Sequence, residues 1–395
     1  MMNRNLSMLF LLNMAVSFSM QLIQPLFPLY LKGLGASEVE IGLVVAVGSI
    51  SATALMLPSG ILVDILGKKM LLLIGVILSS VSPFLLAAVS DWRLMTPFYM
   101  MFSSSFSFFV PTRMALVAES TTPESRARLF GFMNIAWPIG GIIAPYASGL
   151  TIESFGWPVT LILSGCIGLA SLIPTLLIRD ISVKSTESIL KRRSSSIFIK
   201  DHMNLMALFF CFHFLETMGL GMVDLALPLL MQDRFRLSYH LIGLFFTGAN
   251  LITLVTQIPS GYLADRYGRK AVILTCIAGI PVALGLWLFI DDWITMMILY
   301  IAAQGFWSMT WPATLALLTD SVHPDAMGAA FGIRMTGVRL GFTIGPAISG
   351  AMYNPLGHPF IFITAALLYV ASIPLAMLFD EARVNFSRNS PTIEI

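Results

Sequence analysis

Two acidic residues, Glu216 and Asp224, lie well inside an apolar segment of this sequence, near residues 204–230. They are eight residues apart, so a helix would place them about 80° from one another, on one broad face. Because desolvation favours the protonated form of a carboxylate, such a group can bind and release a proton reversibly. We therefore expect Asp224, together with Glu216, to carry ion coupling or substrate binding. The alternatives are a structural ion pair, for example with Arg113, and a side chain near the interface that reaches water.

His213 precedes Glu216 by three residues and shares its face of the expected helix. We expect it to pack near the cytoplasmic mouth of the protein.

The composition indicates that these residues lie in a membrane. Of 395 residues, 57% are hydrophobic and 11% are charged, and the mean hydropathy is +0.84. A net charge of +2, spread over short loops, gives no basic face for a nucleic acid. The three cysteines are far apart and show no metal-binding spacing, so we expect no metal and no cofactor.

Apolar runs between charged or Gly/Pro-rich breaks predict an all-α membrane protein with twelve transmembrane helices, because a spanning helix needs about 20 apolar residues. The predicted spans lie near 6–30, 40–59, 70–90, 94–118, 129–150, 158–178, 204–230, 240–260, 271–290, 294–318, 327–350 and 359–379. We expect a six-helix bundle over 1–178, a polar linker over 179–203, a second six-helix bundle over 204–380 and a tail over 381–395.

The basic residues predict the orientation. With the N-terminus in the cytoplasm, sixteen Lys and Arg residues lie inside and four outside, as the positive-inside rule requires. An even number of spans then returns the C-terminus to the cytoplasm. The expected location is a plasma membrane or a bacterial inner membrane, with the protein as a monomer in the lipid bilayer.

The chain repeats itself at an offset of 201 residues. This offset brings Pro58-Ser59-Gly60 onto Pro259-Ser260-Gly261 and Asp91-Trp92 onto Asp292-Trp293. Matches of Gly, Pro and Asp over more than a hundred residues mark an internal repeat. Two homologous halves that rock about a site near the midplane are the architecture of alternating-access transporters.

The loops after the second and eighth spans read GILVDILGKK from Gly60 and GYLADRYGRK from Gly261. Both resemble the G-x-x-x-D-R-x-G-R-K signature of the major facilitator superfamily, although the first has Ile65 in place of arginine. The matching positions, which we expect to form gating loops, are Gly60, Asp64, Gly67, Lys68, Lys69, Gly261, Asp265, Arg266, Gly268, Arg269 and Lys270.

The fifth and eleventh spans carry a second resemblance, to the Gly/Pro-rich helix of drug:proton antiporters. Ala144 and Ser148 stand where that motif has glycine. The expected helix-packing positions are Gly131, Gly140, Pro145, Gly149, Gly332, Gly341, Gly345, Pro346 and Gly350. Small residues at such spacing also serve ordinary close packing of membrane helices.

The superfamily resemblance implies two further assignments. Asp64 and Asp265 would form a latch with facing helices, with Arg334 as the partner of Asp64 and Arg126 or Arg128 as the partner of Asp265. Alternatively, these loops serve only to fix the orientation. Helices one, four, seven and ten of the family line the cavity, which implies that Arg113, Gln21 and Gln24 lie there with Glu216 and Asp224.

The sequence therefore favours a secondary active transporter that expels small amphipathic or lipophilic molecules in exchange for protons. The arginine that many proton-driven members carry in helix four has no equivalent here, since Met100 and Ile301 occupy the two corresponding positions. Proton-coupled uptake of a polar nutrient or organic anion is the first alternative, favoured by the buried arginines and glutamines. A receptor or scaffold without turnover is a remote one. The sequence has no nucleophile–base pair, metal-ligand cluster or Walker motif that would indicate an enzyme.

Overall fold

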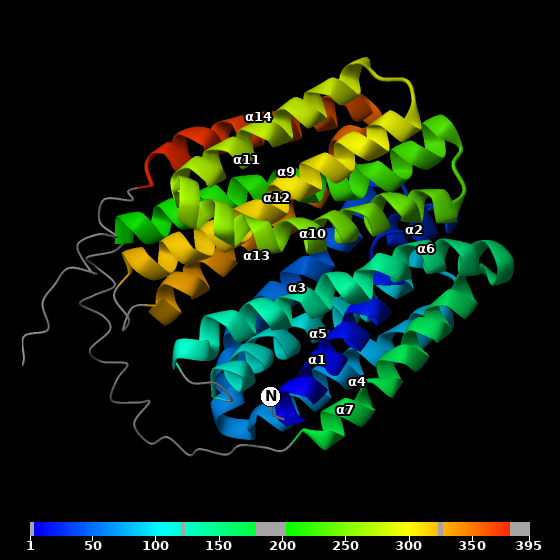
Figure 1. The fold of residues 1–395 in the computed structure, drawn as a ribbon. Coiled ribbons are helices and arrows are strands. Elements are labelled where there is room, and N and C mark those ends of the chain that lie inside the picture. The colour runs from blue at the N-terminus through cyan, green and yellow to red at the C-terminus, as the bar shows by residue number, and fades with distance from the viewer. Residues whose placement is uncertain (1–3, 120–122, 179–202, 323–326, 380–395) are drawn as a thin grey trace, which may run out of the picture. The chain divides into compact units, whose positions relative to one another are not determined.

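A computed structural model describes residues 4–119, 123–178, 203–322 and 327–379, which are helical almost throughout (Figure 1). The elements are α1 (Arg4–Gln21), α2 (Phe27–Gly33), α3 (Glu38–Leu66), α4 (Lys68–Ala87), α5 (Trp92–Glu119), α6 (Pro123–Ala170), α7 (Leu172–Leu177), α9 (Met203–Phe235), α10 (Tyr239–Tyr267), α11 (Arg269–Leu286), the 3-10 turn η1 (Trp287–Phe289), α12 (Trp293–Ser321), α13 (Met327–Leu356) and α14 (His358–Met377).

Each of the twelve predicted spans coincides with helix. The first is divided between α1 and α2, and α6 contains the fifth span and the start of the sixth, with a kink at Gly156. Seven described segments are each long and apolar enough to cross a membrane, within α3, α4, α6–α7, α9, α10, α11–η1 and α14. The helices α1, α5, α12 and α13 are long enough, with 18, 28, 29 and 30 residues, but they fall outside this group.

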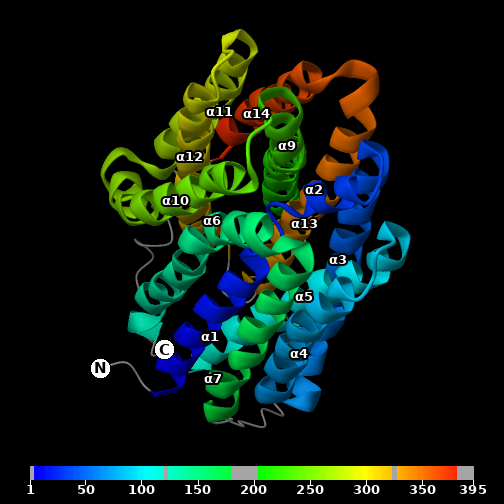
Figure 2. The same ribbon diagram turned by 90° about the vertical axis from the view of Figure 1, so that its right-hand side faces the viewer.

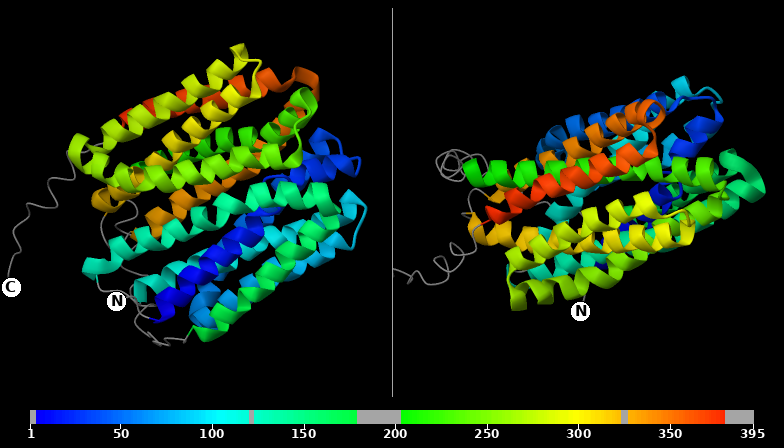
Figure 3. Two further views of the ribbon diagram at one scale, coloured as in Figure 1. Left: turned by 45° about the vertical axis from the view of Figure 1, so that its right-hand side comes forward. Right: turned by 90° about the horizontal axis from the view of Figure 1, so that it is seen from above.

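The described helices form two compact units. One contains the described residues of Met1–Val183, Met222–Leu254 and Thr343–Ile361, and the other contains those of Lys184–Gly221, Val255–Phe342 and Phe362–Ile395. In the first unit α1 packs along α6, and α3 and α4 pack along α5 (Figures 1 and 2). In the second unit α11 packs along α12 (Figure 3).

The backbone repeats with the predicted offset of 201 residues. Described residues with positive φ fall into three pairs at this offset: Gly35 (88°) with Arg236 (50°), Gly67 (83°) with Gly268 (93°), and Gly156 (82°) with Gly357 (83°). Gly67 joins α3 to α4 and Gly268 joins α10 to α11 in a conformation that only glycine adopts readily. The turn itself therefore requires glycine at positions 67 and 268.

The basic pairs that follow these glycines anchor the last helix of each half. Lys69 donates to the carbonyl of Leu176 (2.7 Å) and Lys270 to that of Met377 (2.5 Å), which are equivalent positions at the same offset. A cation stabilises the free carbonyls at a helix C-terminus. Arg269 also forms an ion pair with Asp320 of α12. Part of the loop signature is thus structural.

In the first unit, helices of one half of the repeat cross helices of the other half at close range. A Cβ on Gly42 of α3 would lie 2.6 Å from the carbonyl oxygen of Pro346 of α13, and one on Gly243 of α10 would collide with the carbonyl of Pro145 of α6. The two crossings are related by the repeat offset. Glycine is needed at each because the backbones approach closely.

Charged and polar groups close the end of the first unit that contains Lys32. Lys32 lies 3.0 Å from Glu38 and 2.7 Å from Asp233, which also accepts a hydrogen bond from Tyr353 (2.9 Å). Asn354 donates to Glu38 (2.6 Å). Burial would lower the pKa of Lys32, but hydrogen bonds and charges from Asp233 and Glu38 outweigh that effect and raise it. This cluster of Lys32, Glu38, Asp233, Tyr353 and Asn354, the Lys32 cluster, joins the first half to the second.

The helix crossings predict opposite effects for two Gly-to-Ala substitutions. We expect Gly243→Ala to lower the free energy of unfolding by about 1–3 kcal/mol, because the added methyl group overpacks the contact with Pro145. Gly285→Ala in α11 is the control, since nothing lies within 4 Å of its added Cβ. It should leave stability unchanged or raise it by up to about 1 kcal/mol, through helix propensity. Thermal unfolding in detergent measures both, and equal stability of the two variants would contradict the crossing.

Candidate functional site

Three polar residues of α9 share one buried face. His213, Glu216 and Thr217 have side chains that are 0% exposed, and their spacing of three and four residues places them on adjoining turns. Thr217 donates to the carbonyl of His213 (2.6 Å) and lies 3.1 Å from the carbonyl of Val338 in α13. The hydroxyl is therefore satisfied at the contact between the two helices, and His213 and Glu216 remain to interact with other polar groups.

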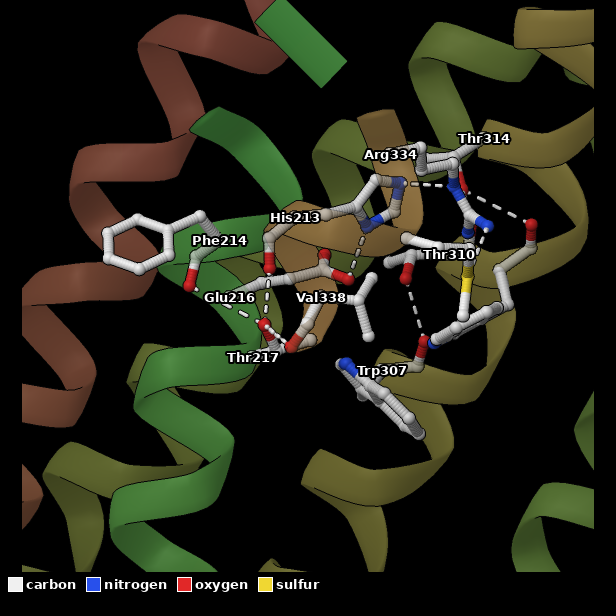
Figure 4. A network of polar contacts seen from close by, with 11 residues as sticks. His213, Phe214, Glu216, Thr217, Trp307, Thr310, Thr314, Arg334 and Val338 are labelled. Carbon is white, nitrogen blue, oxygen red and sulfur yellow. Dashed lines mark hydrogen bonds and ion pairs between the residues drawn. The ribbon is translucent and has the colours of Figure 1, made fainter. Parts of the chain in front are cut away.

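Arg334 of α13 completes a charged network with these residues. Its Nε donates to Nε2 of His213 (2.8 Å), and Nδ1 of His213 lies 2.8 Å from Oε1 of Glu216. Figure 4 shows His213 between the other two side chains. Arg334 is 2% exposed. The carboxylate and the guanidinium are thus linked through an imidazole, and their opposite charges offset one another inside the bundle.

The rest of the Arg334 side chain lies against α12. Its guanidinium carbon is 4.5 Å from the centre of the Trp311 ring, and its Nη2 is 3.5 Å from the hydroxyl of Thr314. A cation over an indole face gains about 0.5–1 kcal/mol at exposed sites and about 2 kcal/mol or more when desolvated. The aromatic ring therefore replaces part of the water that the arginine has lost.

Three buried polar atoms next to this network have no hydrogen-bond partner among the described residues. They are Oε2 of Glu216, Nε1 of Trp307 and Nε1 of Trp311. The indole nitrogen of Trp307 faces the network in Figure 4. Because Oε1 of Glu216 already accepts a bond, Oε2 is the atom of this carboxyl that has room for a proton.

Close packing of α9 on α13 holds the network together. A Cβ on Gly341 would lie 2.7 Å from the backbone nitrogen of Met218, and one on Gly337 would lie 2.5 Å from the carbonyl oxygen of Phe210. Without side chains at these positions the helix backbones can approach closely. Gly341 belongs to the predicted packing motif, whereas Gly337 was not singled out from the sequence.

The other residues expected to line the cavity lie in the first unit. Asp224 is half-buried on α9, and Gln24 is exposed. Gln21 forms a reciprocal amide pair with Asn250 of α10, with both hydrogen bonds at 3.1 Å. Arg113 donates to Asn134 (3.4 Å) and lies 6.0 Å from the Phe109 ring centre. Gln21 and Arg113 therefore have polar partners from neighbouring helices.

Of the expected gating-loop residues, Asp265 and Arg266 are exposed. Lys68 and Gly261 are half-buried, and nothing lies within 4 Å of a Cβ on Gly261. The surroundings of five predicted positions lie outside what the structure describes: Gly60, Asp64, Arg126, Arg128 and Gly131. The latch pairs, including that of Asp64 with Arg334, stay predictions.

The packing-motif residues lie mostly against backbone. A Cβ on Gly140 would lie 2.5 Å from the carbonyl oxygen of Met14, and Cβ atoms on Gly149 and Gly350 would collide with the backbones of His240 and Glu38. Gly345 is buried. Gly332 differs, since nothing lies within 4 Å of its added Cβ.

Reasoning from the sequence missed the function of His213 as a bridge. The three-residue spacing from Glu216 is visible in the sequence, but Arg334 lies 121 residues from His213, and nothing in the sequence pairs the two. A histidine one turn from a buried carboxylate was the available signal.

Twelve helical spans, two homologous halves and a buried charged network define a multi-span membrane transporter. The sequence pattern of the Major Facilitator Superfamily matches residues 9–214 and again residues 208–394. The chain therefore belongs to this superfamily. The predicted fold class, the resemblance to the drug:proton antiporter branch and the transporter function are confirmed.

Known relatives match over most of their length. The chain is 26% identical over 358 residues to the quinolone resistance protein NorA of Staphylococcus aureus (strain COL), covering 89% of this chain and 91% of that protein. It is 23% identical over 389 residues to the multidrug resistance protein 2 of Bacillus subtilis (strain 168), covering 96% of each. The solved structure of a D-xylose-proton symporter has a TM-score of 0.81 at 13% identity, with 96% and 98% coverage, and shares the fold.

The charged network predicts a non-additive double-mutant cycle. Arg334→Met should lower stability by about 3–5 kcal/mol, because it leaves the Glu216 carboxylate buried without its cation. Adding Glu216→Gln to this variant removes the uncompensated charge and should restore most of the loss. Thermal unfolding of the two single variants and the double variant measures the coupling. Losses that simply add would show that the two charges do not depend on one another.

Proposed function

We propose that this transporter expels small amphipathic or lipophilic molecules in exchange for protons, and that Glu216 couples the two fluxes. Two relatives whose names refer to quinolone and multidrug resistance support this class of substrate. Met335 lies beside the network, and a methionine side chain can adapt to apolar molecules of different shapes. Trp307 and Trp311 add aromatic surface next to it.

The observation that carries the proposal is a fully buried carboxyl that is bonded to His213 through one oxygen and lies near the indole nitrogen of Trp307. Glu216 is 0% exposed, and its Oε2 makes no hydrogen bond of ordinary geometry among the described residues. An ionised acid at the centre of a spanning helix costs about 2.5–3.5 kcal/mol on insertion scales. The ionised form depends on Arg334, linked to it through His213, whereas the protonated form does not. Protonation therefore changes how strongly α9 is held to α13, and a change of this kind can bias a conformational equilibrium.

Orientation and location follow the distribution of charge. We place both termini in the cytoplasm, and the protein as a monomer in a plasma membrane or a bacterial inner membrane. The Lys32 cluster then lies at the outer surface, where it holds the outer ends of the two halves together. The gating loops after α3 and α10 lie at the inner surface.

Proton-coupled uptake of a polar nutrient or organic anion is the second candidate. It was favoured by Gln21 and by buried arginines as groups that could bind a polar substrate. Gln21 is engaged with Asn250 and Arg334 with His213, so efflux is the better supported of the two directions.

Substrate-dependent proton flux in proteoliposomes tests the coupling site. With an imposed pH gradient and a panel of dyes, drugs, sugars and organic anions, wild-type protein should expel lipophilic compounds. Glu216→Gln should lower pH-driven flux at least about tenfold while substrate exchange without a gradient persists, because the neutral amide mimics the protonated acid. Asp224→Asn tests the second carboxylate of α9 in the same way.

Asp291→Asn serves as the control, since this exposed carboxylate lies in the loop between η1 and α12. It should leave both activities unchanged. Normal pH-driven flux in Glu216→Gln and Asp224→Asn would remove both from the coupling step, and uptake of a sugar or organic anion would favour the second candidate.

The gating loops give a separate prediction. If Asp64 and Asp265 act as latches, Asp64→Asn and Asp265→Asn should slow transport and shift the balance between inward-open and outward-open states, because each loses a charge that holds a facing helix terminus. Cysteine accessibility measures this balance, with protein yield and membrane insertion as controls. Turnover equal to that of wild type in both variants would leave the loops with a topological and structural role only.

A further inference from the structure

His213 is the only link between the two charges of the network among their described contacts. Both of its ring nitrogens are engaged, Nε2 with Arg334 and Nδ1 with Glu216, each at 2.8 Å. Its side chain is 0% exposed, so the ring is enclosed by protein in this conformation.

The bond that Arg334 donates to Nε2 of His213 determines whether Nδ1 carries a hydrogen. An arginine has hydrogen-bond donors and no acceptor, so Nε of Arg334 must donate to Nε2 of His213. That nitrogen therefore has no proton of its own, and the imidazole is neutral with its hydrogen on Nδ1. It follows that Nδ1–H donates to Oε1 of Glu216.

The surroundings of His213 support a neutral ring. Phe209 and Phe212 of the same helix have ring centres 6.4 and 5.1 Å away, and Trp311 of α12 lies at 6.1 Å. Phe379, beyond α14, stacks on Phe209 at 4.6 Å. Among the described residues, Glu216 from α9 and Arg334 from α13 are the charged groups that contact the imidazole. An added positive charge on the ring would lie directly beside the guanidinium.

We propose that His213 is a positioning residue for proton coupling: it stays neutral, transfers the influence of Arg334 to Glu216, and leaves Oε2 as the atom that binds the transported proton. This inference rests on the proposed function of Glu216. In the binding step Oε2 takes a proton from a hydronium ion, which becomes water, and the carboxylate becomes a carboxylic acid. The hydrogen on Nδ1 and the charge of Arg334 do not change.

Two substitutions separate this role from simple packing. His213→Phe retains an aromatic ring between Phe209 and Trp311 but removes the donor to Glu216 and the acceptor for Arg334. His213→Asn places an amide nitrogen where Nδ1 lies and so retains the donor. The readout is the pH profile of substrate flux in proteoliposomes, with exchange at fixed pH as the measure of folded protein.

We expect the midpoint of the pH profile to rise by about one to two pH units in His213→Phe, because the ionised carboxylate loses a hydrogen bond. In His213→Asn the midpoint should stay within about half a unit of wild type. An unshifted midpoint in His213→Phe, or an equal shift in both variants, would overturn the proposal. Pumping that stays pH-driven in Glu216→Gln would instead overturn the proposed function itself.

The wild-type protein offers an independent test, in which a variant serves only to assign one signal. Nitrogen-15 NMR of histidine-labelled protein distinguishes the two neutral tautomers from the imidazolium. The chain has five histidines, and the signal of His213 is identified by its loss in His213→Asn. A neutral ring with its hydrogen on Nδ1 across the working pH range is the expected result. An imidazolium would show that His213 carries the proton itself, and a neutral ring with its hydrogen on Nε2 would contradict the bond from Arg334 and overturn the proposal.

Discussion

The cost of burying charge governs the second half of this transporter. Glu216 and Arg334 have each given up water, and each charge offsets part of the cost of burying the other. They do not touch directly, since His213 lies between them. Gly337 and Gly341 allow α13 to approach α9 closely, and this brings Arg334 within reach of His213. A single proton on Glu216 removes one of the two charges, so the contact between the two helices depends on protonation.

Close approach of helix backbones also holds the first unit together, at the end that contains Lys32. Gly42 and Gly243 allow two crossings related by the internal repeat, and the Lys32 cluster adds charged and polar bonds around them. Exposed ion pairs contribute little individually, so the fit of glycine against the carbonyls of Pro346 and Pro145 is the main constraint there. The glycine crossings thus occur in both halves of the repeat, whereas the charged network of His213, Glu216 and Arg334 occurs only in the second half.

The fold can be predicted from the sequence, because the helical spans, the distribution of positive charge and the repeat are all patterns in the order of residues along the chain. Gly67 and Gly268 belong to the loop signature read from the sequence, and the structure gives each a positive φ. The site could be read only in part. Glu216 stands out as an acid within a span, but Arg334, which reaches it through His213, comes from α13, and no local pattern shows which arginine balances its charge. Lys69 and Lys270 were assigned to gating, whereas their contacts with the last helix of each half appear only in three dimensions.

The most direct test of the account is the release of protons when substrate binds. In weakly buffered detergent solution, a transported dye added to the wild-type protein should displace protons into the medium, because drug and proton compete through the state of Glu216. The Glu216→Gln protein should bind the dye without releasing protons. Undiminished release from that variant would contradict the central claim that this carboxyl carries the exchanged proton.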